Sequence, residues 1–401
     1  MNSQSNNRGL AFVELAFILV YIYLCISPKM NILVPVHLFL GLELLYSVFV
    51  YILDKKIRKL ILIFAFTSLL IAVFFSVLTS IVYIESTASN RILKSIVTML
   101  NSFYGLVFPL FLYYRIHMNA SVKQKYLFLA LSSIVLVVVF NITLAELEIN
   151  ARALKSQMQA SLEGNPMVGG YNFVCAAPVL ATGTFYCFIM ASHKLVKLLL
   201  LLVSFFFIYF LSKSMYSIAL LSGVLGMASC LYAVSKSHYK RLFWLVPILG
   251  WICAPFVLDF VIDILEEGDT KLRMQELYNF FTSGDLGDDD LGARMNLYYK
   301  GIMAFLSSPI WGNYELRFNP HSTIIEILAS IGLMGGVCFY KSLKTAFLTL
   351  SQLLSGFSIL PCLFAFLFMA LTNPIHSSPI LNISLWLLIP LLYNIFDNKK
   401  F

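Results

Sequence analysis

Long apolar runs dominate this sequence. A helix needs about 20 mostly apolar residues to cross the hydrocarbon core of a bilayer. Runs of roughly that length follow one another at 10–26, 32–53, 60–84, 92–114, 126–145, 171–190, 195–212, 214–234, 242–264, 322–340, 354–372 and 379–396. Charged residues make up 12% of the chain, against about 25% in soluble domains. We therefore expect an all-α polytopic membrane protein of about 12 transmembrane helices, with residues 1–401 forming a single integral membrane domain.

The lysines and arginines predict how these helices are oriented, because cytoplasmic loops are enriched in both residues. If both termini lie in the cytoplasm, 17 of the 28 lysines and arginines fall in inner segments, whereas the outer connections other than the loop at 265–320 hold six. The even number of runs agrees with this arrangement. We therefore expect both termini inside. We also expect the first run to be retained as a span, since no small-residue cleavage site follows it.

Two of the outer connections are long. The first covers residues 146–170 and the second covers residues 265–320, between the ninth and tenth runs. Long structured loops on one side of a membrane domain are where binding and catalytic residues usually lie. We expect the functional site in these two loops, and the catalytic elements in the second.

The cysteines and the short motifs exclude several classes of protein. All seven cysteines fall in apolar runs without a C-x-x-C pair, so no disulfide framework or zinc site is expected. The acidic run at 285–290 lacks the ligand spacing of a calcium loop and is interpreted as a solvated turn. No Walker A, H-E-x-x-H or G-x-S-x-G motif is present, so ATP-driven, zinc-protease and serine-hydrolase functions have no support.

Arg294 opens a segment of helical periodicity in the second long loop. Apolar residues recur there at Leu297, Tyr298, Gly301, Ile302 and Phe305. This pattern predicts a helix lying against the membrane surface, with Arg294 in its first turn. An arginine in such a helix either contacts lipid phosphate or binds a phosphate-bearing substrate, because its planar guanidinium donates two parallel hydrogen bonds.

His321 lies where the second long loop meets the tenth run. Pro320 ends the loop, and Thr323 with Glu326 matches the pattern of a capping box. The free N–H groups and the positive dipole end of a helix favour an anion at such a place and disfavour a protonated histidine. A neutral histidine beside an anionic ligand can act as a general base. The alternative is that His321 only helps to cap the helix.

Among the charged residues within or at the ends of other runs, Lys213, Glu14 and Glu43 are further candidates. Lys213 is at an outer boundary, where it either snorkels to the headgroups or binds an anion. Glu14 and Glu43 fall inside the first two runs, where an acidic residue is a functional candidate by default. The sequence does not identify their partners.

Taken together, these features resemble the core signature of the O-antigen polymerase and ligase superfamily, whose fold is that of a GT-C-like glycosyltransferase. In that signature a loop arginine precedes a proline–aromatic–glycine turn, and a histidine opens a span that carries a glutamate and two glycines. The matching positions are Arg294, Pro309-Ile310-Trp311-Gly312, His321, Glu326, Gly332 and Gly335. The N-P in "EGNPMVGGYNF" and the large loop between the ninth and tenth spans extend the resemblance. Ser212-Lys213 stands where family members often carry Ser-Arg. A lysine ammonium would there replace a guanidinium that can donate two parallel hydrogen bonds.

The resemblance implies a metal-independent, inverting glycosyltransferase without a cofactor, acting on undecaprenyl-diphosphate-linked oligosaccharides. Its active site would face the periplasm from the bacterial inner membrane. The catalytic residues would be Arg294 on the diphosphate, His321 as the base and Glu326 orienting it. Further diphosphate-binding residues would be Arg152, Lys213 and Arg317. Its partners would be the lipid bilayer, a chain-length regulator and a flippase, and no nucleic acid.

Within this family we favour a polysaccharide polymerase, which extends O-antigen or capsule chains. The second long loop is modest, no soluble domain is appended, and the lysine at 213 suits a divergent group of polymerases. An O-antigen ligase, which transfers the chain to lipid A–core, is the first alternative. A membrane transporter or flippase is the second, although no inverted repeat is visible. A structural membrane subunit would leave the outer cations and His321 unexplained.

Overall fold

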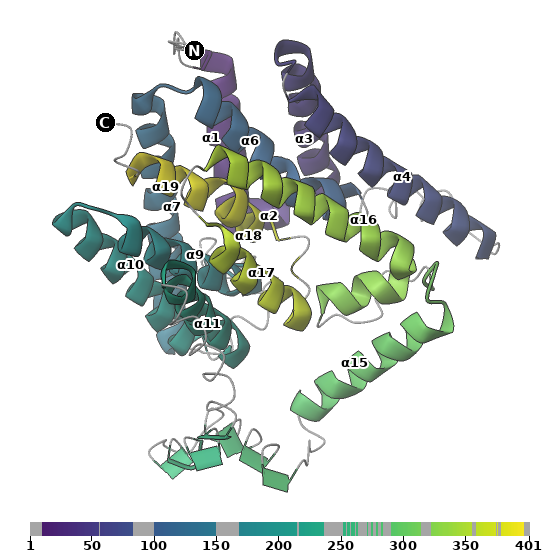
Figure 1. The fold of residues 1–401 in the computed structure, drawn as a ribbon, viewed down its shortest axis with the longest axis vertical. Helices are drawn as coiled ribbons and strands as arrows, with labels where there is room; N and C mark the ends of the chain where they lie inside the picture. Colours follow the sequence, from purple (N-terminus) through teal and green to yellow (C-terminus); the bar gives the residue numbers. More distant parts are fainter. Residues whose placement is uncertain are drawn as a thin grey trace.

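The computed structural model describes residues 10–55, 57–82, 100–149, 168–214, 216–235, 290–313, 322–354, 358–373, 375 and 378–396, with short pieces between 252 and 283. All regular structure in these ranges is helical, which confirms the all-α class (Figure 1). The main elements are α1 (Phe12–Ile26), α2 (Pro28–Leu33), α3 (Val36–Leu53), α4 (Arg58–Val82), η1 (Asn101–Gly105), α6 (Leu106–Asn119), α7 (Val122–Ile149), α9 (Tyr171–Met190), α10 (Lys194–Lys213), α11 (Ser217–Val234), α15 (Asp290–Ser307), α16 (Thr323–Leu353), α17 (Leu360–Thr372), α18 (Pro379–Ile383), η3 (Ser384–Leu388) and α19 (Ile389–Phe396).

Four of the described helices are long and apolar enough to cross a membrane: α7, α9, α10 and α16. The predicted count of about 12 spans stays a prediction, because parts of the runs at 242–264 and 92–114 lie outside the described residues. Within the described ranges, the predicted boundary near Ser214 is correct, since α10 ends at Lys213 and α11 begins at Ser217. The helix that contains the predicted span 322–340 is longer than that span, because α16 continues to Leu353.

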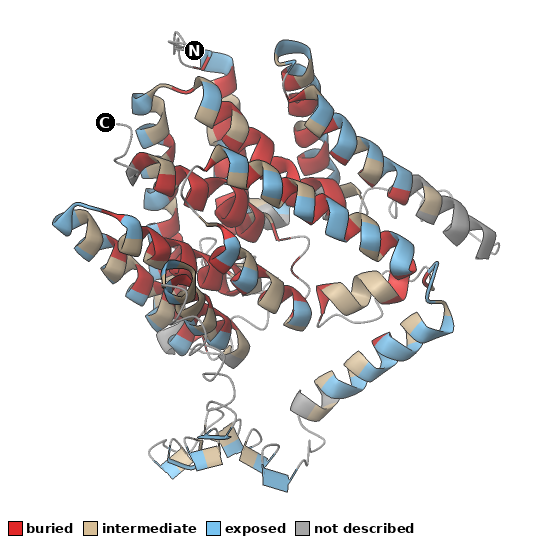
Figure 2. Cartoon of the chain, viewed as in Figure 1, coloured by how far each residue is buried: buried red, intermediate tan, exposed pale blue. Residues whose placement is uncertain are grey.

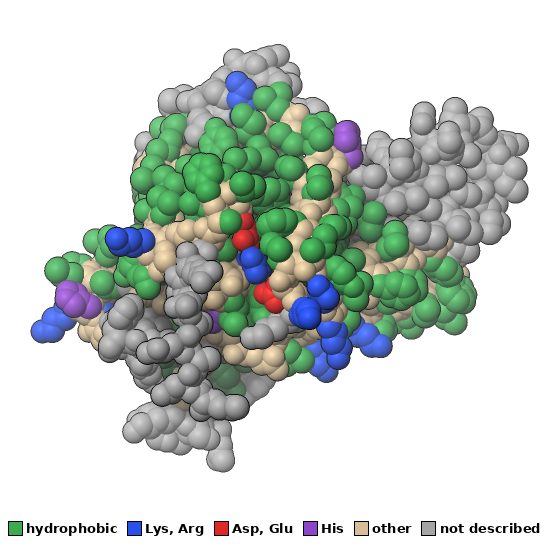
Figure 3. Space-filling model, turned by 90° about the horizontal axis from the view of Figure 1, so that it is seen from above, with side chains coloured by type: hydrophobic (Ala, Val, Ile, Leu, Met, Phe, Trp, Pro, Cys, Tyr) green, Lys and Arg blue, Asp and Glu red, His purple; other side chains and the backbone are tan. Residues whose placement is uncertain are grey.

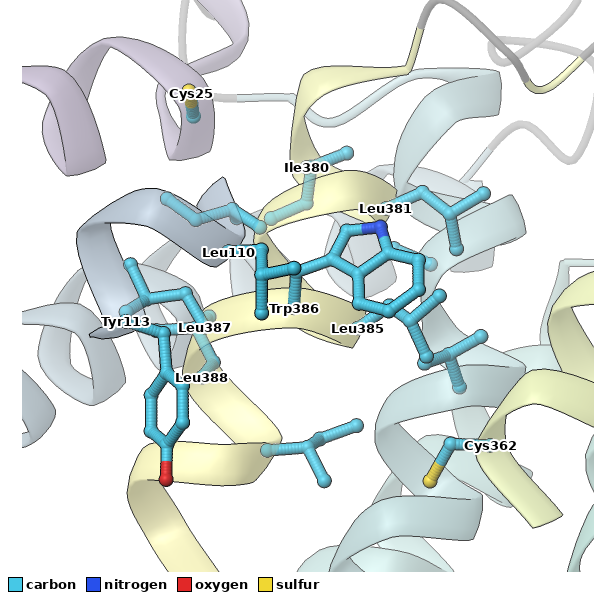
Figure 4. Close-up of a cluster of buried hydrophobic side chains, with 14 of the residues drawn as sticks. Cys25, Leu110, Tyr113, Cys362, Ile380, Leu381, Leu385, Trp386, Leu387 and Leu388 are labelled. Atoms are coloured by element: carbon cyan, nitrogen blue, oxygen red, sulfur yellow. The ribbon is translucent and has the colours of Figure 1, made fainter. Parts of the chain in front are cut away.

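Helix α9 forms the centre of the structure. It packs against α10, α11, α17, α18 and α19 and is buried along most of its length (Figure 2). Small residues let its neighbours approach closely, as they do in membrane helix pairs. A Cβ added to Gly226 of α11, for example, would lie 2.1 Å from the Thr182 hydroxyl. Trp386 of η3 is fully buried in the adjoining core (Figure 4), where apolar residues such as Leu385 and Leu110 surround it.

The turn at 308–313 fits against a kink in α16. Gly312 and Gly332 both have positive φ, 77° and 58°. The Leu333 N–H donates to the Pro309 carbonyl at 2.8 Å, and the Asn313 N–H donates to the Ala329 carbonyl at 2.9 Å. A Cβ at either glycine would collide with the backbone of the other segment. Two glycines of the sequence motif therefore form a backbone joint between the end of α15 and the middle of α16.

Gly332→Ala is expected to lower the stability of the folded protein by about 1–3 kcal/mol, the usual cost of a residue held in a glycine-only conformation. Its ψ of −163° lies outside the region that alanine adopts, and the new Cβ would lie 2.4 Å from the Ile310 carbonyl oxygen. Thermal unfolding of the purified protein in lipid nanodiscs measures this loss. The matched control is Gly41→Ala in α3, where no atom lies within 4 Å of an added Cβ. Equal midpoints for Gly332→Ala and the wild type would contradict the joint.

Candidate functional site

The start of α16 is fixed by two neighbouring hydroxyl groups. Ser322 is the N-cap, and its side chain accepts a hydrogen bond from the Ile325 N–H at 3.2 Å. The Thr323 hydroxyl donates to the Asn373 carbonyl at 2.9 Å and accepts from the Ile375 N–H at 2.7 Å. The first turn of α16 is therefore bound to the chain segment that leaves α17.

This arrangement corrects the predicted capping box of Thr323 and Glu326. The cap is one residue earlier, at Ser322, because the Thr323 hydroxyl bonds the segment after α17 instead. The Thr323 N–H also donates to the Asn373 carbonyl, at 3.1 Å. Several N–H groups of this first turn are thus used inside the protein. An anion placed here would interact with the dipole of α16 more than with free N–H groups.

Tyr171 connects this helix start to α9. Its hydroxyl donates to the side-chain oxygen of Asn373, and its ring lies 5.3 Å from that of Tyr216, centroid to centroid. Tyr171 is the first residue of α9, Tyr216 immediately precedes α11 and Asn373 immediately follows α17. Four elements therefore meet at this point, and one of them begins shortly after the first long loop.

Arg294 of α15 faces the same point. Its guanidinium lies close enough to the Tyr171 hydroxyl to interact with it electrostatically. It also acts on Tyr298, one turn further along α15: burial raises the pKa of the Tyr298 phenol, and the charge of Arg294 opposes that rise. Arg294 is half-buried and lies on the side of α15 that faces the protein. Because α15 begins at Asp290, Arg294 lies beyond the predicted first turn.

The other predicted site residues are distributed as follows. Glu326 is half-buried in α16, and its backbone N–H donates to the Ser322 carbonyl at 2.9 Å. Lys213 is exposed at the end of α10, with its ammonium 5.8 Å from the centre of the Tyr209 ring. Three predicted site residues lie outside the described ranges: Arg152, Arg317 and His321. The described residues therefore link Arg294 to Tyr171 by electrostatic interaction, and the placement of these three stays a prediction.

Tyr171, Tyr216 and Asn373 were missed by sequence reasoning. Tyr171 and Asn373 carried a usable signal, because each is a polar residue at the boundary between an apolar run and a loop. Tyr171 follows the paired glycines of "VGGYNF", and Asn373 begins "NPIH" between the last two runs. Their roles became clear only from the contact between them, which joins positions 202 residues apart.

The structure supplies partners for the two glutamates in the first runs. Arg115 holds both oxygens of Glu14, at 2.8 and 2.9 Å, and also lies 3.3 Å from Asp54. The Tyr46 hydroxyl donates to Glu14 at 3.0 Å, and the Tyr21 hydroxyl donates to Glu43 at 2.8 Å. A paired and hydrogen-bonded charge is tolerated in a protein interior. Glu14 therefore has a structural explanation, which removes one of the two residues that pointed to a transporter.

Hydrophobic side chains form broad areas of the described surface, and basic side chains lie at several points along their margins (Figure 3). An apolar cavity of about 580 Å³ opens between α7, α9, α10 and the η3–α19 segment. Its lining is mostly leucine and phenylalanine, with Ser132, Asn141 and Thr184 among the polar residues. The lining contains neither Arg294 nor Tyr171, so this cavity is separate from the junction at the start of α16.

The described part of the chain contains no group of three or more His, Cys, Asp and Glu side chains placed to hold a metal ion. The junction at the start of α16 instead combines a cation, two phenols, an amide and a helix N-terminus. No protein-family model matches the chain, and no curated protein matches it.

Proposed function

We propose that this protein is a membrane glycosyltransferase that polymerises polysaccharide repeat units. It transfers a glycan chain from undecaprenyl diphosphate to the non-reducing end of another lipid-linked repeat unit. The reaction takes place at the outer face of the bacterial inner membrane, and the product is an O-antigen or a capsule.

One observation carries this proposal: Arg294 interacts electrostatically with Tyr171, whose hydroxyl bonds Asn373 where the segment after α17 holds the first turn of α16. A guanidinium and the positive end of a helix dipole both favour an anion. The residue that precedes this helix cap in the sequence is His321. A diphosphate and a general base are the two requirements of a glycosyl transfer from a lipid diphosphate, and this junction is suited to both.

The proposed chemistry is one in-line displacement. An acceptor hydroxyl attacks the anomeric carbon, the bond from that carbon to the diphosphate oxygen breaks, and the leaving diphosphate keeps the electron pair. His321 takes the proton of the hydroxyl, and Glu326 orients His321. Arg294 stabilises the charge that develops on the diphosphate. Arg152, Lys213 and Arg317 add positive charge around it. A single displacement inverts the configuration at the anomeric carbon.

Deletion of the gene tests this function in the bacterium that carries it. We expect surface glycolipids that each carry one repeat unit, because units still cross the membrane and are still attached, but are not joined. Electrophoresis of lipopolysaccharide or capsule shows this as loss of the ladder of longer chains, restored by the intact gene.

Two other results would contradict a polymerase. Long lipid-linked chains that remain unattached would indicate a ligase. Lipid-linked single units that accumulate without reaching the outer face would indicate a flippase. Each of these results identifies the alternative function directly.

A further inference from the structure

Helix α15 has three faces with different surroundings. The first is half-buried or buried and contains Arg294, Leu297, Tyr298, Gly301 and Phe305. The second is exposed and apolar, and the third is exposed and polar. A helix face that contacts water is normally polar, so the exposed apolar face of α15 needs an explanation.

The half-buried face packs against the protein. Helix α15 contacts α16, and the two lie beside each other in Figure 1. The sequence predicted that this face would lie against the membrane. Of the five predicted residues only Ile302 is exposed, and the other four are turned toward the protein. These four residues therefore pack against the protein, and the predicted position of the helix at the membrane surface stays a prediction.

The exposed apolar face contains residues at the spacing of one helix side: Met295, Tyr299, Ile302 and Leu306. Tyr299 is 61% exposed and Leu306 is 58% exposed. Such a contiguous row of large apolar side chains marks an interaction surface. One residue further round the helix lie the exposed polar residues Asn296, Lys300 and Ser307, with the exposed Met303 between the two faces.

The apolar face of α15 continues into the exposed face of α16. Ile310 and Trp311 extend it past the end of α15, and both are exposed. The Ile310 carbonyl accepts a hydrogen bond from the Met334 N–H at 3.2 Å. From there the exposed surface of α16 continues through apolar residues: Leu333, Met334, Val337 and Tyr340. Because α16 is long and apolar enough to cross a membrane, this surface is a candidate for its lipid-facing side.

We propose that the apolar face of α15 lies in the lipid of the leaflet at the N-terminal end of α16, with its polar face at the boundary to water. The occupant is lipid because the face joins the lipid-facing side of a candidate membrane span without a break. The neighbouring Lys300 suits the headgroup region, and Trp311 and Tyr299 are of the aromatic types enriched there. This inference does not depend on the proposed reaction.

Such an anchor would set the depth of Arg294. The half-buried face and the apolar face are on the same rigid helix, so fixing one in lipid fixes the height of the other. Arg294 would then stay at the membrane–water boundary, where lipid headgroups lie. A helix held only by its contact with α16 would lack this constraint.

Nitroxide labels at four positions test the anchor. In a background with Cys253→Ser and Cys338→Ser, the labelled variants are Tyr299→Cys and Leu306→Cys on the apolar face, and Lys300→Cys and Ser307→Cys on the polar face. Each pair differs by one residue, which makes the polar positions matched controls. The protein is reconstituted as single copies in nanodiscs of phosphatidylethanolamine and phosphatidylglycerol. The ratio of collisions with oxygen to collisions with a water-soluble nickel chelate is then measured.

We expect this ratio to be severalfold higher at 299 and 306 than at 300 and 307, because oxygen concentrates in lipid and the nickel chelate stays in water. If the ratio were equally low at all four positions, with collisions mainly with the nickel chelate, α15 would lie in water and the proposal would be overturned. Low collision rates with both reagents at 299 and 306 would overturn it by showing a protein cover. Spin–spin coupling in samples with two copies per disc would then identify a second copy as that cover.

A second measurement avoids the labels. Brominated lipids quench tryptophan emission on contact, so the difference in quenching between the wild type and Trp311→Phe reports the surroundings of Trp311. We expect brominated lipid to remove more emission intensity, in absolute terms, from the wild type than from the variant. If the two proteins lost the same absolute emission intensity, Trp311 would lie away from lipid. The surface from α15 to α16 would then not be continuous in lipid, which would overturn the proposal.

Discussion

Arg294→Ala is expected to abolish chain extension while the protein still folds. The guanidinium interacts electrostatically with Tyr171, and in the proposed reaction it would stabilise the charge that develops on the leaving diphosphate. Loss of one such preorganised group typically lowers the catalytic rate by about 10²- to 10³-fold. The measurement is transfer between synthetic lipid-diphosphate-linked repeat units by the purified protein in nanodiscs, with product length read by electrophoresis.

Two controls make this result specific for the site. Arg294→Lys keeps the charge but loses the bidentate fork, so it should retain an intermediate activity. Lys300→Ala removes a cation from the exposed polar face of the same helix and should leave the rate within twofold of the wild type. If Lys300→Ala lost as much activity as Arg294→Ala, the positive charge of α15 would act generally and the assigned role of Arg294 would be wrong.

The elements that are apolar along their whole length could be predicted from the sequence. Helices α7, α9, α10 and α16 fall within or around predicted runs, because membrane spans are encoded by local composition. The break between α2 and α3 could not be read from the predicted run at 32–53. It occurs near Pro35, which is the N-cap of α3, since proline suits the entry to a helix better than its interior.

The pairing of distant groups could not be predicted from the sequence. Glu14 and Arg115 are 101 residues apart, and the periodicity of their own helices says nothing about which of them meet. Thr323 gave a plausible local cap, but a tertiary contact with Asn373 outweighs the local pattern. The local sequence indicates which hydrogen bonds and ion pairs a residue can form, whereas the packing of several helices decides which partner it bonds.

The kink at Gly332 shows the same limit within one motif. The sequence identified Gly332 as a match to the family signature, but gave no physical reason for a glycine there. The reason lies in the Pro309–Asn313 turn, whose backbone fits against the kink so closely that any Cβ would collide with it. Gly312 and Gly332 of the motif therefore allow close backbone contact between two segments.

His321→Ala is the second change with a large expected effect. If His321 is the general base, its loss removes proton transfer from the acceptor hydroxyl and lowers the rate by about 10²- to 10⁴-fold. The wild type should also lose activity as the pH falls, because protonation of the imidazole removes the base, and the residual activity of His321→Ala should lack this dependence on pH. The transfer assay measured over a range of pH tests both statements.

The neighbouring cap provides the control for His321. Ser322→Ala removes the hydroxyl that accepts the Ile325 N–H, and it should cost about 1 kcal/mol of stability without changing the pH dependence of transfer. If His321→Ala folded like the wild type and still produced full-length polymer, the assignment of His321 as the general base would be wrong. In that case the helix start, Tyr171 and Arg294 would together form an anion-binding site without a catalytic histidine. A loss of activity in Ser322→Ala as large as in His321→Ala would instead assign both effects to a disturbed start of α16.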